Sequence, residues 1–295
     1  MENPVTIGGL LKSGAQRLAG AGLESYVLDS SILLSHAMGV RRELLFLEPG
    51  KVVDAAAKEA FDVCITRRGK YEPIAYITGK KEFWSLDFTV TRDTLIPRPD
   101  SETLVEAALK RAEKIAQERV KPLTLLDIRI LDIGTGTACL LIALLKELPL
   151  ARGLGVDISE PALQVASHNA QTHGVADRAG FTKSNWCDAV NETFDLIISN
   201  PPYIASGDLP ELMQDVAEYE PHSALFSGTD GMDSYRALAA QVGDRLNSGG
   251  YALFEVGQGQ ADAVAGFLAQ QGLTVDEIKN DLAGTPRCVI ARKTH

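Results

Sequence analysis

The stretch Phe194-Asp195-Leu196-Ile197-Ile198-Ser199-Asn200-Pro201-Pro202-Tyr203 joins an apolar run to a polar loop. The apolar run is rich in Ile and predicts a buried strand that ends at Ser199. The two prolines end the strand, because each removes a backbone donor and fixes φ. In an open α/β sheet, ligands bind at the carboxyl ends of the strands. The sequence therefore predicts a rigid loop, Asn200–Tyr203, at a ligand site.

The residues of this segment, which we call the Asn200 loop, suit a planar amino group. The Asn200 side chain and the Pro201 backbone each offer a carbonyl acceptor, and Tyr203 offers a ring for stacking. An amide or aromatic amine held by both N–H bonds can face an electrophile without a strong base. The alternative is a proline-rich turn after a core strand. We take Asn200, Pro201 and Tyr203 as candidate catalytic residues, and with Pro202 as the substrate-binding loop.

The overall composition is that of an ordinary globular protein. The chain has 295 residues, of which 45% are hydrophobic and 23% charged, enough for two domains. Four scattered cysteines and five histidines show no metal-ligand spacing, so neither a zinc site nor a disulfide framework is expected. No secretory signal opens the sequence and no apolar run is long enough to span a bilayer. We expect a cytoplasmic protein with no membrane partner.

The charge is unevenly distributed along the chain. Residues 1–122 carry 18 basic and 17 acidic side chains, whereas residues 123–295 carry 11 and 22. The acidic second half would repel a phosphate backbone, which argues against a nucleic-acid substrate. It would accept a cationic cofactor or a basic protein partner.

Three parts follow one another along the sequence. Residues 1–78 predict a helical bundle with helices near 10–23, 27–38, 42–47 and 54–68, and Asp54 is the expected N-cap of the last of these helices. Residues 79–99 predict a β-hairpin and linker, and residues 100–295 a catalytic domain that opens with a helix to about Arg119. The long segment 204–232 is a candidate lid.

From Ile128 onward, strands and helices alternate, which predicts an α/β fold with a doubly wound, mostly parallel, seven-stranded sheet. The expected strands are 128–133, 153–157, 180–184, 194–199, 251–256, 273–278 and 287–291. The expected helices between them are 138–147, 161–172, 234–246 and 260–271.

A glycine loop between the first strand and helix of this domain indicates a cofactor site. The segment Asp132-Ile133-Gly134-Thr135-Gly136-Thr137 allows close backbone approach at a helix N-terminus. Asp157 ends the next strand, where a carboxylate can bind ribose hydroxyls, although it could instead be a helix N-cap. A nicotinamide cofactor is the rival, but Cys139 occupies the place of its third glycine. With the Asn200 loop opposite, methyl transfer from S-adenosylmethionine is favoured, with Asp132 facing the cationic end.

A second cofactor contact is expected after the third strand, in Ser184-Asn185-Trp186. Trp186 can pack on adenine, and Asn185 can hydrogen-bond it. The alternative for Trp186 is core packing.

The sequence resembles the peptide chain release factor glutamine methyltransferase family (PrmC, also called HemK) over nearly its whole length. The resemblance rests on Pro73–Gly79, Glu82-Phe83-Trp84, Leu95–Glu102, the glycine loop, Asn200–Tyr203 and Tyr219-Glu220-Pro221. It implies methylation of the side-chain amide nitrogen (N5) of glutamine in the Gly-Gly-Gln motif of release factors, in support of translation termination. By position, it implies cofactor contacts from Gly134 to Ala138 and at Asp157, Trp186 and Asn200. Arg98 is a further candidate substrate contact.

Two positions depart from the family pattern. Ala138 replaces the last glycine of Gly-Thr-Gly-x-Gly, which is tolerated if that residue is already helical but could otherwise crowd the methionine part of the cofactor. Asn185 replaces the usual aspartate, so it can still accept a bond from adenine but without a charge.

We therefore expect a protein glutamine methyltransferase whose residues 1–78 recognise the substrate. The alternatives are an adenine-N6 nucleic-acid methyltransferase and a non-catalytic module that binds S-adenosylmethionine. The acidic second half argues against the first alternative, and the Asn200 loop argues against the second.

Overall fold

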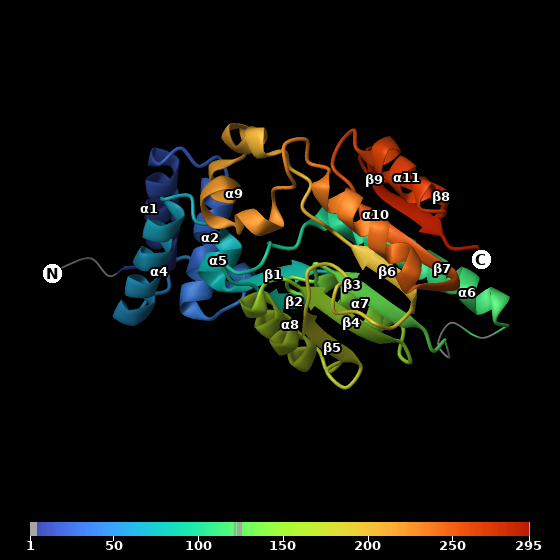
Figure 1. Cartoon of the computed structure of the whole chain (residues 1–295). Helices are drawn as coiled ribbons and strands as arrows, with labels where there is room; N and C mark the ends of the chain where they lie inside the picture. Colours follow the sequence, from blue (N-terminus) through green and yellow to red (C-terminus); the bar gives the residue numbers. More distant parts are fainter. Residues whose placement is uncertain (1–4, 121, 123–125, 295) are drawn as a thin grey trace. The chain divides into compact units, whose positions relative to one another are not determined.

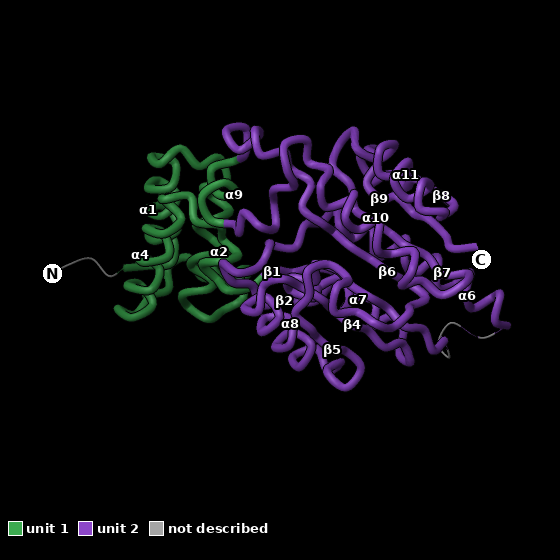
Figure 2. The backbone as a smooth tube through the Cα atoms, in the orientation of Figure 1, with its two compact units in different colours: residues 1–80, 213–219 green, residues 81–212, 220–295 purple. Residues whose placement is uncertain are grey.

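The computed structural model describes residues 5–120, 122 and 126–294. The chain forms two compact units (Figure 2). The first unit contains the described residues as far as Lys80 together with Met213–Tyr219. The second contains the described residues of Lys81–Leu212 and of the segment from Glu220 onward. Among the described residues, we find no helix whose length and apolar character would let it cross a bilayer.

The first unit is helical, with α1 (Ile7–Gly20), α2 (Tyr26–Met38), α3 (Arg42–Leu47), α4 (Ala55–Arg68) and α5 (Ile74–Thr78). The predicted N-cap of α4 is confirmed, because the Asp54 carboxylate accepts a hydrogen bond from Ala57 N at 2.8 Å. Leucine, isoleucine and phenylalanine side chains of α1, α2 and α4 form its buried core. The short α5 was not predicted from the sequence.

A distant segment completes the first unit. Helix α9 (Gln214–Tyr219) lies in the stretch 204–232, which the sequence predicted as one long connection. The Tyr219 hydroxyl donates to the backbone carbonyl of Lys70 at 2.7 Å, and Asp215 lies 3.8 Å from the Arg68 guanidinium. Arg68 is itself buried and paired with Asp29 at 2.7 Å. The two parts of the unit are therefore joined by a partly buried ionic cluster.

The second unit is built on a seven-stranded sheet in the order β5-β4-β3-β6-β7-β9-β8 (Figure 1). Its strands are β3 (Arg129–Ile133), β4 (Arg152–Asp157), β5 (Ala179–Lys183), β6 (Phe194–Ser199), β7 (Leu246–Glu255), β8 (Thr274–Asn280) and β9 (Pro286–Arg292). The neighbouring pairs from β5 to β7 are parallel, and β9 is antiparallel to both β7 and β8. The predicted doubly wound, mostly parallel sheet is confirmed.

Helices cover both faces of the sheet. Alternate side chains of each strand point to opposite faces, so each strand contributes to two separate cores. Ile130 packs in a core with α6 (Glu102–Glu118), α7 (Cys139–Glu147) and α8 (Glu160–Thr172), which we call the α6–α8 core. Leu131 packs on the other face with α10 (Asp233–Arg245) and α11 (Ala261–Gln270), in the α10–α11 core. Before these elements, β1 (Lys80–Phe83) and β2 (Leu86–Thr89) form the predicted hairpin.

The strand order creates a switch point at β3. The chain leaves β3 for β4 and β5 on one side and returns to β6 on the other side. Ile133 pairs with Ser199, so the glycine loop and the Asn200 loop leave the sheet next to each other. Crevices of this kind at carboxyl strand ends are where ligands bind in such sheets.

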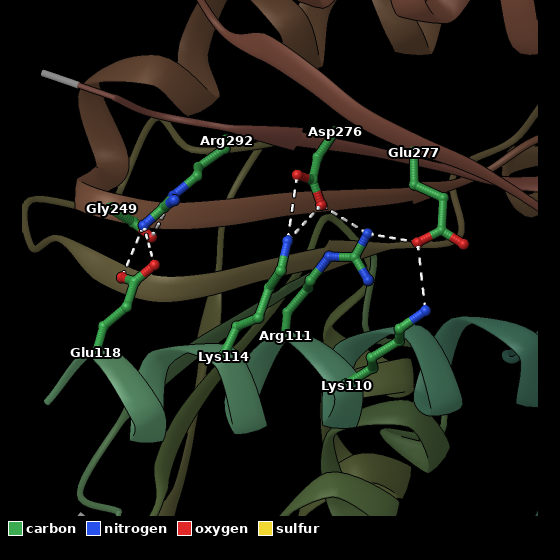
Figure 3. Close-up of polar contacts among 8 residues, drawn as sticks. All are labelled: Lys110, Arg111, Lys114, Glu118, Gly249, Asp276, Glu277 and Arg292. Carbon is green, nitrogen blue, oxygen red and sulfur yellow. Dashed lines mark hydrogen bonds and ion pairs between the residues drawn. The ribbon is translucent and has the colours of Figure 1, made fainter. Parts of the chain in front are cut away.

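An ionic network ties α6 to β8 and β9 (Figure 3). The Arg111 guanidinium, 1% exposed, lies 2.7 Å from both Asp276 and Glu277, and Lys110 and Lys114 approach the same two carboxylates. Beside it, Glu118 pairs with Arg292, whose side chain also donates to the Gly249 carbonyl. The side chains of Asp276 and Glu277 are 25% and 34% exposed, so water still reaches them.

This asymmetry of exposure predicts an asymmetry of stability. The double substitution Asp276→Asn with Glu277→Gln leaves the Arg111 charge buried and unpaired, at a cost of about 3 kcal/mol of unfolding free energy. Arg111→Met leaves two carboxylates that water can solvate, so it should cost less. Urea denaturation followed by circular dichroism measures both, and the triple variant is the control, expected to recover most of the double variant's loss. A larger loss for Arg111→Met than for the double substitution would contradict this account.

Candidate active site

A cavity opens at the carboxyl ends of β3, β4 and β6, and every residue that lines it belongs to the second unit. Ten residues named from the sequence line it: Arg98, Gly134, Thr135, Gly136, Thr137, Asp157, Asn185, Trp186, Asn200 and Pro202. Asp132, Ala138, Pro201 and Tyr203 lie next to these residues but are not part of the lining. The fold therefore brings the two loops that the sequence singled out to one cavity.

The glycine loop is folded over the end of β4. The backbone N–H groups of Gly134 and Thr135 donate to the Val156 carbonyl at 2.8 and 3.0 Å. Gly136 N donates to the Asp157 carboxylate at 2.9 Å. Gly134 and Gly136 have φ of 73° and 52°, and a Cβ at either would meet no atom within 4 Å. The loop thus presents bare backbone to open space, which suits close approach of a ligand.

Ala138 does not have a helical backbone, although alanine was expected to replace glycine there only if the residue were helical. Its φ is 61°, in the left-handed region, and it immediately precedes α7. Its methyl group is fully buried in the α6–α8 core and does not line the cavity. The methyl is accommodated by core packing, so the condition drawn from the sequence was wrong.

The two aspartates of the site occupy different environments. Asp157 borders the cavity and accepts from the backbone of Gly136 and Ser159, both at 2.9 Å. The side chain that caps α8 is Ser159, which accepts from Ala162 N, so Asp157 is not the N-cap. Asp132 is 1% exposed, and its Oδ2 accepts from the Thr135 hydroxyl at 2.6 Å.

Burial leaves Asp132 with unused acceptor capacity. Its Oδ1 has no hydrogen-bond partner among the described residues. Removal from water raises the pKa of Asp132 to about 7, against the lowering effect of the Thr135 bond. A cation placed beside this carboxylate would relieve that cost.

Asn185 and Trp186 follow the carboxyl end of β5 and line the cavity. The Asn185 amide nitrogen donates to the Asp188 carboxylate at 3.1 Å, which leaves the Asn185 carbonyl oxygen free to accept. Trp186 lines the cavity and also packs against the α10–α11 core, so the core-packing interpretation describes part of its surroundings and its contact with adenine stays a prediction.

The Asn200 loop is fixed at both ends. The Ser199 hydroxyl donates to the Ile133 carbonyl at 2.7 Å, and the Asn200 amide nitrogen donates to the Ser101 hydroxyl at 3.1 Å. At the far end, Gln260 Nε2 donates to the Tyr203 carbonyl at 2.8 Å. The Tyr203 ring packs against the α10–α11 core, so its stacking on a substrate amide stays a prediction.

Arg98 lines the cavity, and the segment that carries it is held by Glu220. The Arg98 guanidinium donates to the Glu220 carboxylate, which is buried and also accepts from Ile96 N at 3.1 Å. Residues just after Glu220, among them Pro221 and Phe226, line the cavity. Part of the predicted lid segment therefore forms a wall of the site.

Three residues of the site were not identified from the sequence: Ser101, Glu255 and Gln260. Glu255 is 1% exposed at the end of β7, and burial raises its pKa to about 7 although the neighbouring Ser101 and Asn200 side chains act to lower it. The available signal was a carboxylate inside the apolar run Tyr251–Val256. Ser101 lies in the segment Leu95–Glu102 that carries the family resemblance, whereas no comparable signal marked Gln260.

Both parts of the chain match known protein families. Residues 9–79 match the PrmC N-terminal domain, and residues 126–250 match a methyltransferase domain. A methyltransferase structure from Pyrococcus furiosus covers 73% of this chain and 92% of its own with a TM-score of 0.52, and at 19% identity it shows the fold alone.

Curated relatives are similar over almost the full length. The release factor glutamine methyltransferase of Rhodospirillum rubrum is 44% identical over 292 residues, covering 99% of this chain and 86% of the relative. That of Bradyrhizobium diazoefficiens is 44% identical over 282 residues, covering 95% and 92%. At this identity and coverage, the chain belongs to the release factor glutamine methyltransferase family.

Proposed function

We propose that the protein transfers a methyl group from S-adenosylmethionine to the side-chain amide nitrogen of a glutamine in peptide chain release factors. The glutamine is that of the Gly-Gly-Gln motif, and its methylation supports translation termination. The observation that carries the proposal is the single cavity shared by the Asn200 loop and the glycine loop. The names of the curated relatives support the same activity.

The residues around the cavity fit S-adenosylmethionine. The bare backbone at Gly134 and Gly136 leaves room for a ligand, and the unpartnered Asp132 oxygen suits a nearby positive charge. When bound, S-adenosylmethionine supplies an electrophilic methyl group.

Each residue of the cofactor site has a proposed task. Thr135 and Thr137 would contact the cofactor as part of the glycine loop. Asp157 would bind the ribose hydroxyls of the cofactor, and Asn185 and Trp186 would bind its adenine. Asp132 and Ala138 would act from beneath the lining, through charge and packing.

The Asn200 loop would hold the substrate amide. The Asn200 and Pro201 carbonyls would accept hydrogen bonds from the two N–H groups of the substrate amide. Pro202, Tyr203 and Arg98 would complete the substrate pocket. Stiff prolines and fixed loop ends keep these acceptors in place before the substrate arrives, so the nitrogen is oriented without a strong base.

The remaining features support a protein substrate. The second half of the chain is strongly acidic, which opposes a phosphate backbone and disfavours the nucleic-acid alternative. We assign recognition of the folded release factor to residues 1–78, because a helical domain far larger than one glutamine side chain offers a separate contact surface. All four cysteines are free, as suits a protein of the reducing cytoplasm.

Transfer of labelled methyl tests the proposal directly. The protein is incubated with methyl-labelled S-adenosylmethionine, a purified release factor and bulk DNA. We expect label in the factor, in the peptide that contains Gly-Gly-Gln, and none in DNA. A release factor with that glutamine replaced by alanine is the control. Label in DNA, or label in the control factor, would overturn the proposal, and comparable binding of NAD in calorimetry would argue against the cofactor.

A further inference from the structure

A buried polar relay stands behind the Asn200 side chain. Strands β6 and β7 are parallel neighbours in which Ser199 pairs with Phe254, so Asn200 and Glu255 follow at adjacent positions. The Asn200 amide nitrogen donates to the Ser101 hydroxyl at 3.1 Å. The Glu255 carboxylate lies near both side chains, which act to lower its pKa, and its Oε2 has no hydrogen-bond partner among the described residues. Ser101 is 3% exposed and Glu255 is 1% exposed.

An ionised carboxylate beside Asn200 would select which end of the Asn200 amide faces the cavity. An asparagine amide can turn over, exchanging a donor for an acceptor at nearly the same place. An ionised carboxylate can only accept, so it requires the donor end of Asn200 and the hydroxyl proton of Ser101 on its own side. The carbonyl oxygen of Asn200 is then the end left for the cavity.

We propose that Glu255 is a positioning residue for methyl transfer, which acts with Ser101 to keep the Asn200 carbonyl oxygen directed at the substrate amide. This inference rests on the proposed function. If Asn200 turned over, its N–H groups would meet the N–H groups of the substrate, and the amide would lose its acceptor. Glu255 itself touches neither substrate nor cofactor in this scheme.

The protonation state of Glu255 decides whether the relay holds. A protonated carboxyl can donate, so the reversed amide becomes equally acceptable. Burial raises the pKa of Glu255 to about 7, with Asp100 raising it and Arg287 lowering it. The other titratable groups that face it have raised pKa values of their own and stay neutral near pH 7: Tyr203, Tyr235, Cys139 and Cys288. The turnover number should therefore rise as pH increases through about 7.

The test compares Glu255→Gln with the wild type, both as full-length protein acting on an intact release factor. We measure kcat and KM from about pH 6 to 8.5 at saturating S-adenosylmethionine, because Asp132 also titrates near pH 7 and would affect cofactor binding. We expect Glu255→Gln to lower kcat about 10- to 100-fold. Both KM values should change little, and the rise of kcat near pH 7 should disappear.

Two further variants make the result specific. Ser101→Ala breaks the relay without changing the carboxylate, so it should lower kcat in the same direction, and it decides the question if Glu255→Gln does not fold. Tyr235→Phe is the matched control, because it removes the 2.9 Å bond from the Tyr235 hydroxyl to the Glu255 backbone carbonyl and leaves the relay intact. It should keep the wild-type pH profile.

The outcomes separate this inference from the proposed function. Wild-type protein that leaves the factor unmethylated contradicts the function, whatever the variants do. Wild-type activity with an unchanged kcat and pH profile in Glu255→Gln overturns the role of Glu255. An equal loss of kcat in Tyr235→Phe would also overturn it, because the effect would then be one of local packing.

Discussion

Asn200→Ala is expected to reduce kcat for release factor methylation by about 100-fold or more, in line with the loss of one preorganised polar group. Asn200 supplies the acceptor that orients the reacting nitrogen, and its amide is already held by Ser101 before substrate binds. The substitution therefore removes the positioning of the reacting nitrogen, which slows the chemical step. Single-turnover kinetics at saturating cofactor and factor measure it.

Asn185→Ala provides the contrast within the same cavity. Asn185 borders the cofactor end, where its carbonyl oxygen is left free by the bond to Asp188. Its loss should weaken S-adenosylmethionine binding, measured by calorimetry, with a nearly normal kcat at saturation. Wild-type kcat in Asn200→Ala, or equal effects of the two substitutions on kcat, would contradict the division of the site into an amide end and a cofactor end.

Gly231→Ala is expected to lower kcat by a similar factor, about 100-fold, through displacement of the Asn200 loop. A Cβ at Gly231 would run into the backbone carbonyl of Tyr203, the atom that Gln260 holds at 2.8 Å. That carbonyl belongs to the loop itself and cannot move aside alone, so the shift passes along the prolines to Asn200. The kcat of the folded variant is the measurement.

Gly228→Ala is the matched control, because its backbone is nearly the same. Gly228 and Gly231 have φ of 74° and 75°, so each alanine carries a left-handed strain of about 1–2 kcal/mol. At Gly228, however, the added Cβ meets the Asp233 carboxylate, the end of a side chain that can rotate away. We expect similar losses of thermal stability in both variants and a large loss of kcat in Gly231→Ala alone. Equal losses of kcat would show that strain, and not loop displacement, is responsible.

The sequence determined most of the fold, because local patterns report backbone conformation and burial directly. The run Phe194–Ser199 and its two following prolines predicted a buried strand that ends at Ser199, and β6 has those bounds. Glycine loop, strand alternation and helix caps such as Asp54 were equally local signals, and the elements they predict are present. Of the ten cavity-lining residues named from the sequence, Asp157 ends β4 and the other nine belong to loops that follow or precede such elements.

The tertiary structure decided which of these pieces meet. Nothing in the sequence near Gln214–Tyr219 shows that this helix packs with the first unit, since its partners are more than a hundred residues away. The left-handed backbone of Ala138 likewise depends on core packing that no local preference for alanine would indicate. Glu255 could be recognised as a misplaced charge in an apolar strand, but only the β6–β7 register places it beside Asn200. Backbone preferences and hydrophobic patterns can be read from residues adjacent in the sequence. The site joins residues distant in the sequence, so strand register and long-range contacts decide which of them meet.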